Sequence, residues 1–223
     1  MQRFLLVAVL LLGFVVAGLV TDSTARGRKA PKASDDRSGA FDYYVISLSW
    51  SPTFCETHPD ETDQCGEKGY GFVLHGLWPQ YQRGGGPQRC ASDTRPDSHT
   101  IKQALAFMPS RRLIQHEWQA HGACSGLDPK GYFDLADRAF AAVHVPPALS
   151  APIVAPQMDE AQVIQAFVTA NSGLHSESIR LHCSSGELAE VRVCVDKNLD
   201  PRACGARMQS RCPSGVLQIP LSR

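Results

Sequence analysis

The sequence predicts an α+β fold, in which a central, mostly antiparallel β-sheet packs with several α-helices and four disulfides staple the chain. Three observations support this prediction. The chain of 223 residues is 43% hydrophobic, which is enough to bury a core. Strand-like and helix-like segments are mixed without the regular period of βαβ units. Eight cysteines, an even number, follow an apolar N-terminal run typical of exported chains, in which disulfides persist.

The first 25 residues are predicted to be a signal peptide. An uncharged, apolar run over residues 4–20 precedes small residues that favour cleavage after Ala25. The alternative is a retained anchor, because this run reaches the lower limit of about 17 residues for a membrane span. We expect residues 26–40 to be a flexible polar segment and residues 41–223 to form one folded domain. The expected location is secreted or periplasmic, without stable membrane association after cleavage.

The first predicted strand covers residues 42–50, whose alternating Tyr44, Ile46, Leu48 and Trp50 would share one face. Further strands are predicted at residues 71–75, 188–195 and 216–219. Gly76 and Pro79 are expected to stop the second strand, so that His75 ends it and a turn follows. The third strand alternates throughout and is expected to be central.

Three helices are predicted between these strands. Ser110 is a candidate cap for a helix that carries Leu113, Ile114 and Trp118 and ends at Gly122. The other helices are predicted over residues 131–143 and 159–170, the latter beginning with acidic residues that suit the helix dipole. Residues 83–87, with three consecutive glycines, are expected to form a loop.

The segment HEWQAHGAC, residues 116–124, contains the candidate catalytic side chains of the first predicted helix. On a helix, His116, Glu117, Ala120 and His121 would span an arc of about 140°, while Trp118 would point away and pack. A zinc site of the His-Glu-x-x-His type is disfavoured, because these histidines are five positions apart instead of four. Burying all three polar side chains would be unfavourable without partners. Acid–base catalysis suits them better, since imidazole titrates near neutral pH.

The segment HGLWPQ, residues 75–80, is the second candidate. His75 would project from a rigid strand end, and Trp78 would offer a flat face on which a nucleic-acid base can stack. Taken alone, a histidine is more often structural and a Trp-Pro turn more often packs. The formal net charge of zero also disfavours a sequence-independent nucleic-acid binder, so any such binding would be local.

Together, the two segments resemble the active-site segments of the ribonuclease T2 family. The strand that ends in Ser-Leu-Ser-Trp and the segment LAEVRVCVDKNLDPRAC at residues 188–204 resemble the family as well. The resemblance covers residues 41–212. It implies a catalytic domain over residues 41–223 that acts as a monomeric endoribonuclease on single-stranded RNA, without a cofactor or metal. DNA would be excluded because it lacks the 2′-OH.

The resemblance also implies roles for single residues. His121 matches the family's general base and His75 its general acid, while His116 matches the phosphate-binding histidine and Glu117 the residue that assists the transition state. The 2′-OH would attack the adjacent phosphorus, and the resulting 2′,3′-cyclic phosphate would hydrolyse to a 3′-phosphate. Trp78 lies where the family stacks a base. Gln80 lies near the base as well, and base preference stays open.

One departure from the family pattern concerns Ala120, where the family usually has a lysine that neutralises negative charge in the transition state. Arg111 and Arg112 lie more than two helical turns away and are poor replacements. The working hypothesis is retained but reduced activity. The alternative is a catalytically impaired relative that binds RNA or signals, and a secreted zinc enzyme ranks third.

Sequence alone leaves 105 pairings open for eight cysteines. The resemblance narrows them, since the family joins the positions of Cys90 and Cys124, which would pin both histidine segments across one cleft. The remaining pairs would be Cys183–Cys212, Cys194–Cys204 and Cys55–Cys65. The other histidines occupy polar or loop contexts and are expected to be structural or superficial: His58, His99, His144, His175 and His182.

Overall fold

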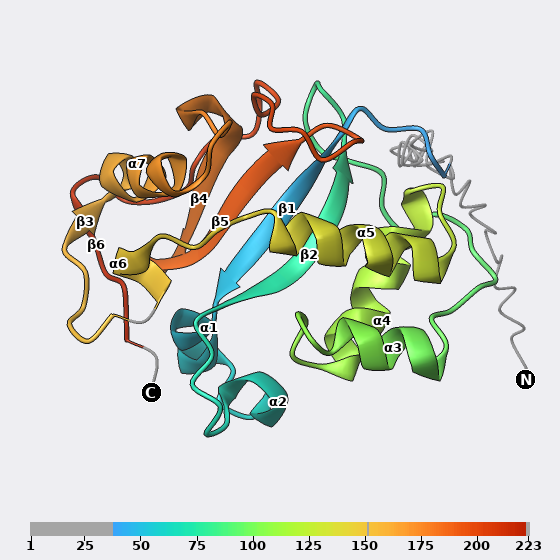
Figure 1. Ribbon diagram of the computed structural model, residues 1–223, viewed down its shortest axis with the longest axis horizontal. Coiled ribbons are helices and arrows are strands. Elements are labelled where there is room, and N and C mark those ends of the chain that lie inside the picture. The colour runs from blue at the N-terminus through green and yellow to red at the C-terminus, as the bar shows by residue number, and fades with distance from the viewer. Residues whose placement is uncertain (1–37, 151, 222–223) are drawn as a thin grey trace, which may run out of the picture. The chain divides into compact units, whose positions relative to one another are not determined.

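The computed structural model describes residues 38–150 and 152–221, so the predicted signal peptide and most of the polar segment lie outside the described residues. Figure 1 shows the arrangement of its elements. The strands are β1 (Tyr43–Trp50), β2 (Phe72–Gln80), β3 (Met158–Asp159), β4 (Ile179–Ser184), β5 (Glu187–Val195) and β6 (Val216–Leu217). The helices are α1 (Ser51–Thr57), α2 (Thr62–Cys65), α3 (Ser98–Ala104), α4 (Arg111–Ala120), α5 (Pro129–Ala141), α6 (Pro147–Ser150) and α7 (Glu160–Ala170). Two 3-10 turns, η1 (Gly122–Cys124) and η2 (Ser176–Ser178), complete the list.

The main sheet has four antiparallel strands in the order β2-β1-β5-β4, and β3 pairs with β6 in a second, two-stranded sheet. Every residue of β1 is buried, because helices or loops cover both faces of this strand. Helix α5 contacts β1 and β2, α4 contacts β2, and α7 contacts β4 (Figure 1). The predicted α+β class and the central position of β5 are therefore confirmed.

The predicted end of the second strand at His75 is wrong. Strand β2 continues through Gly76 and Pro79 to Gln80, so His75 lies inside a strand and no turn follows it. Because β2 is an edge strand, proline is tolerated there. The pairing with β1 shifts between Ser47 and Leu48, which face Gly76 and Leu74, so His75 is the extra residue of a β-bulge.

Several elements were not predicted. Helix α1 follows β1 directly and carries Pro52 in its first turn, where the missing N–H of proline is harmless. Strand β4 lies at an edge of the sheet and contains the polar residues Arg180 and His182. Because of these polar residues, the sequence did not indicate a strand here. Within residues 38–150 and 152–221, none of the helices has the length and apolar character needed to cross a membrane.

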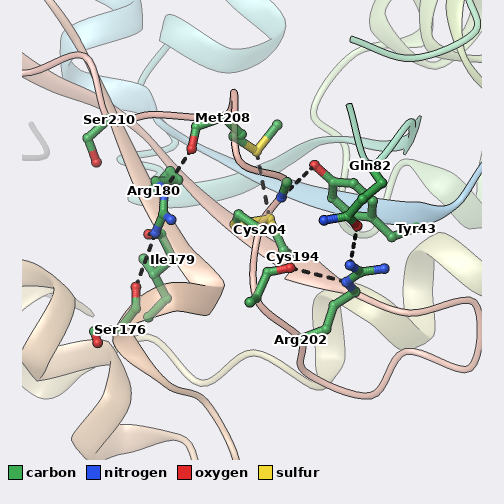
Figure 2. Close-up of a disulfide and its surroundings, with 12 residues drawn as sticks. Tyr43, Gln82, Ser176, Ile179, Arg180, Cys194, Arg202, Cys204, Met208 and Ser210 are labelled. Atoms are coloured by element: carbon green, nitrogen blue, oxygen red, sulfur yellow. Dashed lines mark hydrogen bonds between the residues drawn. A yellow bond between two sulfur atoms is a disulfide. The ribbon is translucent and has the colours of Figure 1, made fainter. Parts of the chain in front are cut away.

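Four disulfides join Cys55–Cys65, Cys90–Cys124, Cys183–Cys212 and Cys194–Cys204, the pairing that the resemblance implies. The last bridge lies in a small second core with Tyr43 and Val45 of β1 (Figure 2). There the Arg202 guanidinium lies 4.6 Å from the Tyr43 ring centroid and donates to Gln82. The Tyr43 hydroxyl in turn accepts a hydrogen bond from the Gly205 N–H. This bridge therefore secures the segment after β5 to β5 itself, beside the start of β1.

Candidate active site

The β-bulge of β2 presents His75 to two carboxylates. Its Nδ1 lies 2.7 Å from Oε1 of Glu190 on β5, and its Nε2 lies 3.7 Å from Oε1 of Glu117 on α4. Bulges re-aim side chains beside functional sites. Burial disfavours the imidazolium, but the hydrogen bond to Glu190 and the charges of both carboxylates outweigh it, so the pKa of His75 is raised. His75 thus favours its protonated form.

Helix α4 supplies His116 and Glu117. The predicted cap is confirmed, since the Ser110 hydroxyl accepts a hydrogen bond of 3.1 Å from the Leu113 N–H. Trp118 is buried, as predicted, and donates to the Thr94 carbonyl. His116 is exposed, and its pKa is lowered by partial desolvation and then by the positive charges of Arg89, His75 and Arg112.

Glu117 is a buried carboxylic acid, with only 1% of its surface exposed. Its Oε2 accepts a hydrogen bond of 2.8 Å from the Trp78 indole N–H. Burial raises the pKa of Glu117 to about 7, although the His75 charge and the Trp78 hydrogen bond oppose this shift. Glu117 therefore titrates near neutral pH, where it exchanges a proton readily.

His121 lies one residue beyond helix α4, although its N–H still donates a hydrogen bond of 3.0 Å to the Glu117 carbonyl. Helix α4 ends at Ala120, and His121 is its C-cap, with φ −132° and ψ −47°. The 3-10 turn η1 begins at Gly122, which has no room for a Cβ beside Trp118 and Tyr132. Burial lowers the pKa of His121 to about 4, with help from the charges of His75, His116 and Arg89. His121 is neutral over most of the pH range in which His75 is charged.

Trp78 connects the two histidines. Its ring centroid lies 5.1 Å from that of His75 and 5.4 Å from that of His121. The guanidinium carbon of Arg192 lies 5.2 Å from the same centroid. Arg192 also forms hydrogen bonds of 2.8 and 2.5 Å to Oε2 of Glu190, two residues away on β5. The sequence-predicted residues His75, Glu117, His121 and Trp78 therefore meet in one cluster.

Gln80 does not join this cluster. It is buried at the end of β2, where its amide packs against the backbone of the Gly-rich loop at Gly86. Two residues that sequence reasoning missed take part instead, Glu190 and Arg192. A charged pair inside an otherwise apolar central strand is the signal that could have found them, since such groups are rarely buried without a partner.

A cavity of about 660 Å³ opens beside the cluster, and both His75 and His116 line it. Its other walls include Phe54, His58 and His182, so two histidines expected to be merely structural or superficial face the same cavity. The rings of Phe54 and His58 are stacked, with centroids 4.3 Å apart. Burial, followed by the charge of Arg192, lowers the pKa of His182.

No group of three or more His, Cys, Asp or Glu side chains with the geometry of a metal site occurs among residues 38–150 and 152–221. The eight cysteines are all paired in disulfides.

The site contains one imidazole that favours its protonated form, His75, and one that stays neutral, His121. These two side chains can donate and accept a proton respectively.

This chain is similar in sequence to known proteins of one family. The model of the Ribonuclease T2 family matches residues 41–204. A ribonuclease of Aeromonas hydrophila is 38% identical over 179 residues, which cover 78% of this chain and 81% of the relative. Ribonuclease 3 of Arabidopsis thaliana is 27% identical over 198 residues, which cover 79% and 88% of the two chains.

Solved structures show the same fold. An RNase-related protein from Calystegia sepium has a TM-score of 0.66 at 22% identity, with 82% of this chain and 98% of that chain covered. RNase NT, solved in complex with 5′-AMP, has a TM-score of 0.63 at 22% identity, with 81% and 98% covered. At these identities the likeness establishes the fold alone.

Proposed function

The chain belongs to the ribonuclease T2 family and is an RNA-cleaving endoribonuclease, and on this premise we propose how it cuts its substrate. The reaction is metal-independent transphosphorylation of single-stranded RNA. It uses the 2′-OH as the nucleophile, and this requirement excludes DNA. The observation that carries this proposal is the opposite protonation preference of His75 and His121, whose rings both contact Trp78.

In the first step, neutral His121 removes the 2′-OH proton while the 2′ oxygen attacks phosphorus. His121 Nδ1 is buried, so we assign proton uptake to Nε2. The bond from phosphorus to the 5′ oxygen breaks, and protonated His75 gives its proton to that oxygen. Because Nδ1 of His75 faces Glu190, Nε2 is the nitrogen assigned to the leaving group. The products are a 2′,3′-cyclic phosphate and a free 5′-OH.

In the second step, the two histidines exchange roles. His75, now neutral, takes a proton from water, and the water oxygen attacks the cyclic phosphate. The bond to the 2′ oxygen breaks, His121 returns a proton to it, and a 3′-phosphate remains. His116 contacts the phosphate from α4, and Glu117, with its pKa of about 7, assists charge development at the phosphorane.

Trp78 contributes to substrate binding through the part of its ring that the histidines and Arg192 leave accessible. Its N–H bond to Glu117 fixes that ring relative to the reacting groups. Gln80, buried beneath the Gly-rich loop, is not assigned to base contact. The cavity lined by His75 and His116 has room for a nucleotide adjacent to the scissile bond.

We further propose that the protein acts outside the cytoplasm. Four disulfides suit an oxidising compartment, and the sequence predicts a signal peptide over residues 1–25.

The first prediction concerns cleavage itself. The purified, oxidised protein, incubated with a short single-stranded RNA in excess EDTA, is expected to yield ends that bear 2′,3′-cyclic phosphate. His121→Ala removes the general base and is expected to slow cleavage at least about 100-fold. His175→Ala, which changes an exposed histidine away from the site, is the matched control and should cut like the parent. The readout is the chemical identity of the product ends.

Two outcomes would contradict the proposal. Loss of cleavage in EDTA, restored by zinc, would indicate a metal enzyme. Uncut RNA across mildly acidic to neutral pH would favour the impaired relative, and a binding measurement with the same RNA would then show whether the protein holds RNA without cutting it.

A further inference from the structure

The cluster described above lacks a permanent positive charge that is free to meet a phosphate. The phosphorane is more negative than the substrate phosphate, and His75 supplies one positive charge to it. His116 has a lowered pKa and is largely neutral near pH 7. Ala120 occupies the position of the family lysine and brings no charge. A further cation from another segment would therefore stabilise the transition state.

The backbone of Arg89 is hydrogen-bonded to that of Ala120. Its N–H donates a hydrogen bond of 2.9 Å to the carbonyl of Ala120, the last residue of α4. The next residue, Cys90, forms the disulfide with Cys124, and its own N–H lies 3.2 Å from Sγ of Cys124. These contacts hold the Arg89 backbone beside His121.

The backbone conformation of Arg89 is unusual. Its φ is +53°, in the left-handed region that residues with a Cβ rarely adopt. Such strain persists where the surrounding structure enforces it, and it concentrates at functional sites. A glycine would relieve this strain, yet the chain carries an arginine here, which points to a use for the side chain.

Two other arginines beside the cluster are engaged with carboxylates. Arg112 donates to Glu61, and Arg192 donates to Glu190. Arg89, by contrast, is exposed and has no hydrogen bond or ion pair from its guanidinium within the part of the chain that the structure describes. Its positive charge lowers the pKa of both His116 and His121, so the guanidinium lies within electrostatic range of both imidazoles.

We propose that Arg89 is a catalytic residue that contacts the scissile phosphate and supplies the positive charge absent at Ala120. This inference rests on the proposed ribonuclease mechanism. A guanidinium suits the task, because it stays charged at every working pH and can donate two parallel hydrogen bonds to phosphate oxygens. The cation thus comes from the loop before Cys90 instead of from α4.

The test compares kcat and KM for a short single-stranded RNA among the parent and five variants. Arg89→Gln is expected to lower kcat/KM on the order of 100-fold, and Arg89→Lys to retain part of the activity. Arg83→Gln, an exposed arginine in the preceding loop, is the matched control and should leave the rate unchanged. Arg89→Gln with Ala120→Lys is expected to recover activity, whereas Ala120→Lys alone should not exceed the parent.

A structural role would leave the pH profile unchanged, so this profile is the second readout. The positive charge of Arg89 lowers the pKa of His121, so its removal should raise this pKa and move the acid limb of kcat/KM to higher pH. His75 and His116, whose charges also act on His121, are unchanged in this variant, so the shift reports the Arg89 charge alone. Thermal unfolding of Arg89→Gln should match the parent, because glutamine meets the same backbone strain.

The outcomes separate the two proposals. A parent that cuts RNA together with an Arg89→Gln variant of equal rate and unchanged pH profile would overturn the role of Arg89 alone. A rate above the parent for Ala120→Lys would also overturn it, because the site would then lack the charge assigned to Arg89. A parent that leaves RNA uncut would overturn both the ribonuclease mechanism and the inference built on it.

Discussion

Two chemically identical side chains, His75 and His121, are tuned in opposite directions by their neighbours. Burial alone would lower the pKa of both. The pKa of His75 is nevertheless raised, because Glu190 and Glu117 face its two ring nitrogens. The charges that act on His121, those of His75, His116 and Arg89, are all positive and lower its pKa further. Activity should therefore fall below about pH 4, where His121 becomes protonated, and above the raised pKa of His75.

Glu190→Gln tests this separation. The Glu190 carboxylate stabilises the imidazolium of His75, so its removal should lower the pKa of His75 and move the alkaline limb of kcat/KM to lower pH. The acid limb, set by His121, should stay in place. Glu187→Gln, on the same strand and outside the cluster, serves as the control. An alkaline limb that does not move would mean that Glu190 does not set the protonation of His75.

At the scale of elements, the site depends on an irregularity in one edge strand. The extra residue in β2 turns His75 toward the carboxylates, and Gly76 leaves the space in which Glu117 and Trp78 hydrogen-bond. Strand and helix patterns were sufficient to predict β1, β5, α4, α5 and α7. They could not predict that β2 continues past Gly76, because glycine and proline usually weaken a strand, and only the edge position makes them tolerable.

Gly76→Ala is expected to disturb both folding and catalysis. A Cβ at this position would overlap Oε2 of Glu117 and the indole nitrogen of Trp78. Loss of that hydrogen bond in a buried setting should lower the free energy of unfolding by about 1–3 kcal/mol. The substitution should also reduce kcat, because the displaced Trp78 ring contacts the rings of the catalytic His75 and His121.

Urea unfolding and initial rates measure the two effects of Gly76→Ala. Gly85→Ala is the comparison, since a Cβ there meets open space and adds only backbone strain at φ +68°. Equal behaviour of the two variants would show that the space at Gly76 is not required.

At the scale of the whole molecule, the site joins segments that are far apart in sequence. His75 and Glu190 are 115 residues apart, and Trp78 and Glu117 are 39 apart. The resemblance to a family predicted His75, His116, Glu117 and His121, because their motifs are local. The sequence did not predict a role for Glu190, Arg192 or Arg89. Their local segments do not show that they would lie beside β2 or the end of α4.

Removal of the Cys90–Cys124 bridge tests this long-range assembly. Cys90→Ala with Cys124→Ala opens a loop of sequence separation 34 and should lower the free energy of unfolding by about 2–4 kcal/mol. Cys55→Ala with Cys65→Ala opens a separation of 10 and should cost somewhat less. We expect the first variant to lose most of its activity and the second to retain it, as measured by urea unfolding and initial rates.

A comparable loss of activity in both variants would show that the Cys90–Cys124 bridge has no particular connection to the site. The structure predicts such a connection, because this bridge lies between Arg89 and the end of α4.

The same bridge has a consequence for the cell that makes the protein. Cysteines stay reduced in the cytosol and pair only in oxidising surroundings. A newly made chain still in the cytosol would lack the link between the Arg89 segment and the turn after His121, and we expect it to be a poor enzyme there. The producing cell's own transcripts would then be exposed to little of this activity during synthesis.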